Sequence, residues 1–254
     1  MAICKNLSLT AGFCYFCAYN IMATILCIES ATPICSVALV QNGVVTHIRE
    51  TGILQSHAAS LMEFIQQVLV SAGLAIAALD AIAVSKGPGS YTGLRIGVST
   101  AKGLCFALDK PLIGIGTLKS MAIGMIRAFP SRGAPTLFCP MIDARRMEVY
   151  TALYDITATE VVPVSAKIID ESSFAGVLKN HTVVFAGDGS AKSRTVLQHH
   201  PNARFLNQEI VSATNMAALS NEAFSNGQFE NVAYFEPYYL KDFIAGKSIV
   251  KGLH

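Results

Sequence analysis

Apolar residues in the first half of the chain follow two kinds of pattern, one typical of helices and one typical of strands. At 56–72 they repeat at i, i+3, i+4 and i+7, which predicts an amphipathic helix. Asn42-Gly43, between two β-type runs, is a strong signal for a hairpin. The other expected elements are strands at 25–29, 36–41, 44–50, 81–85 and 111–116, and helices at 93–108 and 117–129. The order β-β-β-α-β-α-β-α indicates a mixed sheet covered by helices.

The second half of the chain repeats this plan with less helix. Prolines and a glycine between 130 and 135 are typical of a linker. After it we expect strands at 137–142, 148–154, 161–169 and 182–186, and helices near 172–178, 192–197 and 215–225. The pattern predicts two α/β domains, at 22–130 and 131–254. Residues 1–21 are expected to be a disordered or artefactual extension, because a strand follows Met22 at once.

Composition narrows the functional class. The 254 residues are 52% hydrophobic and 14% charged, with a net charge of +2, which carries no electrostatic signature of nucleic-acid binding. No apolar run reaches the roughly 20 residues that span a bilayer, so no membrane association is expected. Seven cysteines, an odd number, suit a reducing cytoplasm.

A glycine-rich turn at residues 84–97, VSKGPGSYTGLRIG, is the most informative stretch. Gly87, Gly89 and Gly93 permit positive φ or close approach of another backbone, and Pro88 stiffens the turn. We expect Thr92 to cap the helix that follows. A loop leading into a helix N-terminus can bind phosphate, although the turn matches neither the Walker pattern nor the dinucleotide fingerprint.

The helix expected at 93–108 is apolar on nearly all sides and rich in small residues. An outer helix of this kind is buried all round when a second chain covers it, although an ordinary central helix would show the same pattern. We therefore expect the helices at 56–72 and 93–108 to form a dimer interface. The candidate interface or junction residues are Gly87, Pro88, Gly89, Ser90, Tyr91, Thr92, Gly93, Arg95, Gly97, Thr100, Gly103, Leu61 and Ile65.

Three stretches carry a resemblance to a known family. They are ILCIESATPICSVALVQNG at 25–43, KGPGSYTGLRIGVSTAKGL at 86–104 and IDARRMEVYTALYD at 142–155, and PYYLKD at 237–242 is similar to the family's ending. The chain resembles the bacterial TsaB (YeaZ) family of tRNA threonylcarbamoyladenosine biosynthesis proteins, from about residue 22 to 242. The resemblance implies an actin/Hsp70-like (ASKHA) α/β fold of two related domains, each a mixed sheet covered by helices.

The resemblance also implies a function. TsaB proteins are paralogues of TsaD, the transferase that forms threonylcarbamoyladenosine next to the anticodon of tRNAs. A non-catalytic partner or scaffold of a TsaD-type subunit is therefore expected, with no catalytic residue and no independent catalysis. A TsaE-type ATPase subunit, a homodimer when alone and only indirect contact with tRNA are also expected. The chain would need no cofactor of its own, with ATP or ADP at the junction of the complex.

The sequence also contains candidate residues for metal and nucleotide binding. TsaD holds a metal through a His-x-x-x-His pair, whereas here His57 is followed four residues later by Leu61, so no metal site is expected. Glu29, Ser30, Asp143 and Gly187 stand where actin-like ATPases bind nucleotide. Capping of strand ends is the simpler role for the two carboxylates. The alternative function is a free-standing actin-fold ATPase or small-molecule kinase.

Overall fold

The computed structural model describes residues 23–51, 57–130, 135–208 and 210–241. The expectations for residues 1–21 and for the linker at 131–134 lie outside these ranges. No helix in the described ranges combines the length and the hydropathy needed to cross a bilayer.

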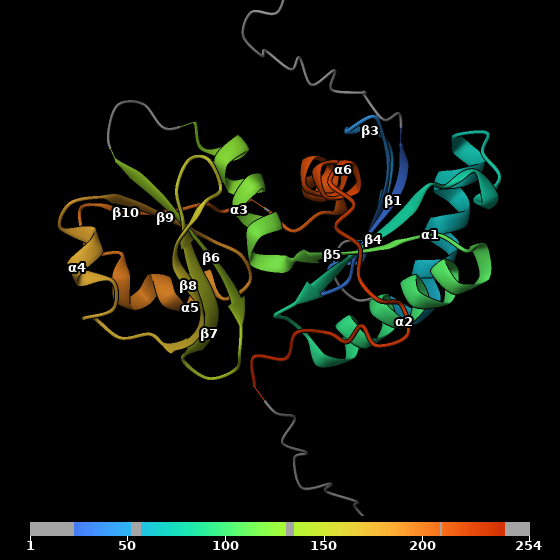
Figure 1. Ribbon diagram of the computed structural model, residues 1–254. Coiled ribbons are helices and arrows are strands. Elements are labelled where there is room, and N and C mark those ends of the chain that lie inside the picture. The colour runs from blue at the N-terminus through green and yellow to red at the C-terminus, as the bar shows by residue number, and fades with distance from the viewer. Residues whose placement is uncertain (1–22, 52–56, 131–134, 209, 242–254) are drawn as a thin grey trace, which may run out of the picture.

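The first sheet has five strands in the order β3-β2-β1-β4-β5 (Figure 1). They are β1 (Thr24–Glu29), β2 (Ser36–Gln41), β3 (Val44–Glu50), β4 (Ala81–Gly87) and β5 (Leu112–Gly116). Strands β1, β2 and β3 pair antiparallel, and β1, β4 and β5 pair parallel. Asn42 and Gly43 form the predicted hairpin turn with φ of 55° and 76°, values that Asn and Gly tolerate well.

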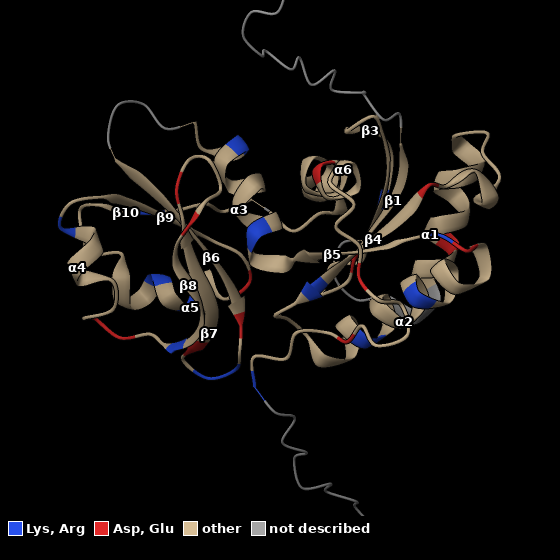
Figure 2. Cartoon of the chain, viewed as in Figure 1, with Lys and Arg blue, Asp and Glu red and all other residues tan. Residues whose placement is uncertain are grey.

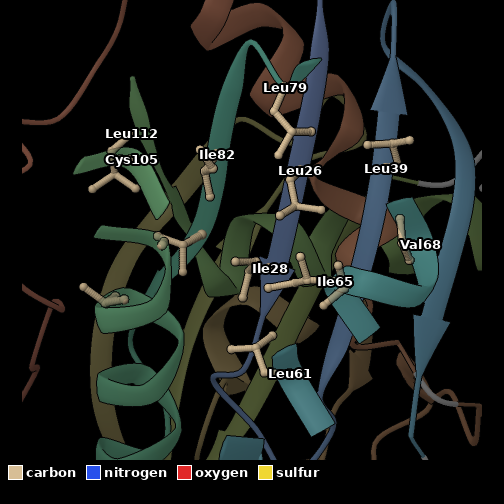
Figure 3. Packing of buried hydrophobic residues seen from close by; sticks show 14 of the residues in the cluster. Leu26, Ile28, Leu39, Leu61, Ile65, Val68, Leu79, Ile82, Cys105 and Leu112 are labelled. Carbon is tan, nitrogen blue, oxygen red and sulfur yellow. The ribbon is translucent and has the colours of Figure 1, made fainter. Parts of the chain in front are cut away.

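Helices cover both faces of this sheet. One face packs against α1 (His57–Ser71) and α2 (Tyr91–Leu108), between which lies the short helix η1 (Ile76–Ala78). Figure 3 shows Leu61 and Ile65 of α1 directed at Leu26 and Ile28 of β1. The other face packs against η2 (Ala213–Met216) and α6 (Ala217–Ser225), which come from the far end of the chain.

The second sheet repeats the topology of the first. Its order is β10-β9-β6-β7-β8, so the first strand again pairs antiparallel with the second and parallel with the fourth. The predicted actin-like fold of two related domains is thereby confirmed. The strands are β6 (Thr136–Asp143), β7 (Glu148–Tyr154), β8 (Glu160–Ile168), β9 (Thr182–Ala186) and β10 (Ala203–Phe205), with helices α3 (Thr117–Ala128), α4 (Ala175–Leu178) and α5 (Ser190–Leu197).

The chain crosses between the two sheets twice. Helix α3 lies between them and packs its buried side against β6, as Leu118, Met121 and Met125 share a cluster with Phe138. After β10 the chain returns to the first sheet, where Glu230 pairs with Leu112 of β5. The two sheets divide between β5 and β6, but α3 packs on the second sheet and the segment from residue 213 to 241 packs largely on the first. The division near residue 130 stays a prediction.

The burial of α1 and α2 differs from the sequence prediction. Leu61 and Ile65 are 0% and 1% exposed and belong to the core under the first sheet, so assigning them to an interface was wrong. Helix α2 is also not buried all round, because Arg95, Gly103 and Phe106 are exposed. Both helices are therefore ordinary amphipathic cover for a sheet, with one face left in solvent.

The glycines of the turn permit close approach to the chain's own backbone. A Cβ on Gly89 would lie 2.4 Å from the Ala31 carbonyl oxygen, and one on Gly93 would lie 2.1 Å from that of Ser30. A Cβ on Gly97 would lie 2.1 Å from Ser30 Oγ. The expectation that these glycines face a second subunit was wrong, because the loop after β1 already fills the space.

The start of α2 is held by hydrogen bonds to the same loop. The Ser90 N–H donates to the Ala31 carbonyl at 2.6 Å, and Ser30 Oγ donates to the Gly93 carbonyl at 2.9 Å. Ser90 is the N-cap, and its hydroxyl accepts from the Gly93 N–H at 3.3 Å. Thr92 therefore does not cap the helix as predicted; the helix begins two residues earlier than expected, at Tyr91.

Glu29 ends β1 as a fully buried carboxyl group. Its Oε1 accepts from the Ala31 N–H at 2.8 Å, whereas Oε2 has no hydrogen-bond partner among the described residues. Burial raises the pKa of Glu29, against the opposing effect of hydrogen bonds from Ala31 and Ser85. Burial, together with the negative charge of Glu29, raises the pKa of the neighbouring Cys35 thiol to about 11.

We predict opposite effects for alanine at two glycines of this region. Gly89→Ala forces its methyl group against the Ala31 carbonyl and should lower the free energy of unfolding by about 1–3 kcal/mol. Gly103→Ala meets nothing within 4 Å in a helix and should raise stability by up to about 1 kcal/mol. Urea unfolding of both variants measures the two effects. Equal stability of the two variants would show that the close approach at Gly89 is not a constraint.

We also predict a pH-dependent effect of Glu29→Gln. Because the folded pKa of Glu29 lies above its unfolded value, the native state retains its proton at a pH where the unfolded state has released it. The wild-type chain should therefore lose stability relative to the variant as the pH rises above 4.5, by at most about 1.4 kcal/mol per pH unit. Unfolding curves between acid and neutral pH test this. A difference that stays constant with pH contradicts it.

Candidate functional site

A cleft of about 540 Å³ lies between the two sheets, where β1, β4 and β6 end. The first domain contributes the loop after β1 and the glycine turn, and the second contributes the β6–β7 turn. The C-terminal segment forms a further wall. The lining residues are Ala31, Thr32, Pro33, Pro88, Gly89, Ser90, Tyr91, Thr92, Ile142, Asp143, Ala144, Arg145, Glu148, Tyr150, Asp188, Tyr238, Tyr239, Leu240 and Lys241.

The structure brings together only part of the predicted nucleotide site. Asp143 lines the cleft, opposite the glycine turn. Glu29 and Ser30 are fully buried behind the loop after β1 and do not line it. Gly187 borders a separate hollow of about 330 Å³ near α5. The two carboxylates do not converge on the cleft, so they do not fit the joint metal–nucleotide site that the sequence offered as a candidate.

Asp143 is engaged by neighbours within its own domain. Its carboxylate accepts from Lys192 Nζ in an ion pair and from the Arg145 N–H at 2.9 Å. Partial burial acts to raise the pKa of Asp143, but these two hydrogen bonds and the positive charges of Lys192 and Arg145 together hold the pKa below its ordinary value. The Asp143 N–H donates to Asp188 Oδ1 at 2.9 Å, which ties the ends of β6 and β9 together.

Gly187 has a local structural role. Its φ is 101°, and a Cβ there would lie 2.3 Å from the Met141 carbonyl oxygen. The residue lets the chain turn from β9 towards α5 against β6, which another amino acid could do only with strain.

The β6–β7 turn carries an exposed arginine pair in place of glycines. Arg145 and Arg146 have φ of 71° and 50°, in the left-handed region that favours Gly or Asn. In Figure 2 acidic and basic residues lie close together around the lower ends of β7 and of the C-terminal segment. No hydrogen bond or ion pair links either guanidinium to a carboxylate in the part of the chain that the structure describes.

Sequence reasoning did not place the C-terminal tyrosines in the cleft. The Tyr91 and Tyr239 rings lie 4.9 Å apart, and the Arg95 guanidinium lies 4.0 Å from the centre of the Tyr91 ring. Arg95 Nε donates to the Tyr239 hydroxyl at 3.2 Å. The available signal was PYYLKD, which resembled the family's ending but carried no information about its contacts.

A second candidate surface lies on the solvent side of α1 and α2. Gly103 is exposed and Thr100 is half-buried, and neither is part of the core. Met62 and Val70 of α1 are 51% and 72% exposed, and Phe106 of α2 is 86% exposed. This is a substantial number of large apolar side chains in solvent for two neighbouring helices.

The described residues do not contain three or more His, Cys, Asp or Glu side chains grouped closely enough to hold a metal ion. Leu61, at the place of the second histidine of the TsaD pair, is in the core. The side chain of His57 lies outside the described residues.

Comparison with known proteins agrees with this architecture. The family model TsaD, tRNA N6-adenosine threonylcarbamoyltransferase, matches residues 39–248. The tRNA threonylcarbamoyladenosine biosynthesis protein TsaB of Escherichia coli is 40% identical over 130 residues, 51% of this chain and 54% of that protein. The TsaB protein of Haemophilus influenzae is 39% identical over 127 residues, 50% of this chain and 52% of its own. The chain thus spans about half the length of these curated relatives.

A solved structure matches over a much larger part of the chain. YeaZ from Pseudomonas aeruginosa is 30% identical, with a TM-score of 0.71, over 86% of this chain and 100% of that one. These matches lead to one conclusion: the chain belongs to the TsaD domain family and, within it, to the TsaB (YeaZ) proteins.

Proposed function

We propose that this chain is a non-catalytic partner of a TsaD-type transferase and is required to form threonylcarbamoyladenosine next to the anticodon of tRNAs. The observation that carries the proposal is Leu61. It stands where the transferase has its second metal-binding histidine, and it is buried in the core under β1. A hydrophobic side chain there cannot ligate, so this chain would support chemistry that occurs on another subunit.

The partner surface in this proposal is the solvent face of α1 and α2. Phe106, Val70 and Met62 provide apolar area that the first domain leaves in water, and Gly103 allows close approach of another helix. The same face would pair two copies when the chain is alone. A TsaE-type ATPase would join the complex, tRNA would be contacted only indirectly, and the complex would work in the cytoplasm.

A nucleotide belongs to the proposal only at the junction of the complex. The cleft has the volume for one, which is what favours the alternative of an independent ATPase or kinase. Against that alternative, Glu29 is buried away from the cleft and Asp143 is paired with Lys192. An ATP or ADP molecule would therefore need groups from the partner.

Gly103→Arg tests the partner surface. An arginine there extends from open space on α2 into the proposed contact, so we expect a folded chain that no longer copurifies with the TsaD-type subunit. Threonylcarbamoyladenosine formed by the reconstituted complex should fall with it. Gly176→Arg on α4 is the matched control, because its Cβ also meets nothing within 4 Å and it lies on the other domain.

Normal assembly and normal tRNA modification with Gly103→Arg would remove α2 from the interface. Gly97→Glu is unsuitable for this test, since its side chain would collide with Ser30 inside the domain.

ATP turnover by the isolated chain separates the two functions. We expect none above the background of Asp143→Asn, because the carboxylates that line the cleft are already engaged within the chain. Asp143 is paired with Lys192 and Glu148 with Lys241, and Asp188 accepts from the Asp143 N–H. Release of phosphate is measured for both proteins with Mg²⁺, without and with the TsaD-type subunit. Turnover by the isolated wild-type chain that Asp143→Asn abolishes would instead support the ATPase or kinase.

A further inference from the structure

The last described residues, 236–241, differ from the segment before them. Residues 230–235 are fixed to the first domain: the Glu230 N–H donates to the Leu112 carbonyl at 2.8 Å, and Phe235 is buried in the core cluster. Lys102 Nζ also donates to the Phe235 carbonyl at 2.8 Å. Beyond Phe235 no described residue is buried. We call residues 236–241 the strap.

The strap lies along the glycine turn as an extended peptide. The Tyr238 N–H donates to the Lys86 carbonyl at 2.6 Å, where β4 ends. A Cβ on Gly87 would lie 2.6 Å from the Tyr238 carbonyl oxygen, so this glycine makes room for the peptide backbone. The middle of the strap is thus held by one backbone hydrogen bond and packs closely against Gly87, which has no side chain.

Side chains at either end of the strap have their own receiving groups. The Tyr239 ring lies against the Tyr91 ring at a tilt of 37°, and its hydroxyl accepts from Arg95. Lys241 Nζ forms an ion pair with the Glu148 carboxylate of β7, in the second domain. The strap is therefore held on both sides of the cleft, and Figure 1 shows it in red, passing from α2 towards the second sheet.

The strap also divides the space between the domains. Tyr238 borders the 540 Å³ cleft on one side and a hollow of about 710 Å³ on the other. The second hollow is lined in part by Lys86, Lys119 and Glu222. Removal of the strap would join the two spaces and uncover the glycine turn.

We propose that the glycine turn, the start of α2 and Glu148 form a peptide-binding groove, which the chain fills in cis with its own strap. Its ligand class is an extended peptide with a backbone N–H at the Tyr238 position, an aromatic ring one residue on and a basic side chain two residues after that. This mode combines main-chain hydrogen bonding with receiving groups for particular side chains. The inference does not depend on the proposed role in tRNA modification.

The contacts of the strap suit reversible release. The Lys241–Glu148 pair is partly exposed, with 48% and 20% of the two side chains accessible, and such pairs add little stability in water. Segments with few buried apolar contacts open locally at much lower free energy than the whole domain. The groove can thus exchange its cis occupant while Phe235 stays in the core.

A peptide competition on the full chain tests the groove. The probe is a fluorescent peptide of the sequence of residues 236–241, EPYYLK. The strap is loosened in the double variant Tyr239→Ala, Lys241→Ala. We expect the variant to bind the peptide with a dissociation constant at least tenfold lower than the wild-type chain, whose groove is filled. A peptide with both tyrosines replaced by alanine should not bind, and adding Glu148→Gln should weaken binding of the intact peptide.

Hydrogen exchange and thermal unfolding accompany the titration. If the strap is a cis ligand, the Tyr238 amide exchanges faster in the double variant, and the midpoint of unfolding changes little. Equal binding of the peptide to wild type and variant, or binding to neither, overturns the proposal. A large fall in the unfolding midpoint without peptide binding also overturns it, because the strap would then be an integral part of the fold.

Discussion

The close contact between α2 and the loop after β1 is the constraint on which the rest of this structure depends. The carbonyl groups of Ser30 and Ala31 occupy positions that side chains would take at Gly93 and Gly89. This allows the Ser90 N–H to reach the Ala31 carbonyl at 2.6 Å and aligns the first turn of α2 beside the end of β1. The wall of the interdomain cleft follows from that alignment, because the same loop and turn line it.

The same contact decides which residues are buried in the domain and which line the cleft, where a ligand could contact them. The side chains of Glu29 and Ser30 are buried and do not line the cleft. The Glu29 carboxyl group accepts from the Ala31 N–H, and the Ser30 hydroxyl donates to the Gly93 carbonyl. The charged groups that line the cleft come instead from the opposite domain and from the strap. Glu29 and Ser30 stand at positions where actin-like ATPases bind nucleotide, yet here they only support the backbone. The path of the loop after β1 decides whether such a side chain lines the cleft or is buried in the domain.

Two surfaces of different character remain on the outside. The solvent face of α1 and α2 carries the exposed apolar side chains of Met62, Val70 and Phe106 and offers area for a stable partner. The groove under the strap is polar and aromatic and is already filled by the chain itself. The first suits lasting assembly and the second suits exchange, because apolar burial grows with contact area whereas an exposed ion pair and a few hydrogen bonds are readily replaced by water.

The sequence by itself determined the elements with strong local signals. The Asn42-Gly43 hairpin, the strand–turn–helix at Gly87–Gly93 and the succession of the longer strands along the chain depend on turn chemistry and periodicity within a few residues. The elements it missed, η1 (Ile76–Ala78) and β10 (Ala203–Phe205), are too short to show a period.

Only the tertiary structure decided which way those elements face. Leu61 and Ile65 share an apolar stripe that could serve a core or an interface, and the sheet above them settled it. The glycines of the turn indicated a close approach but not the segment that approaches them, which is the loop after β1. Arg95 meets Tyr239 across 144 residues of chain, a contact that no local pattern encodes because it exists only after the C-terminal segment has returned to the first domain.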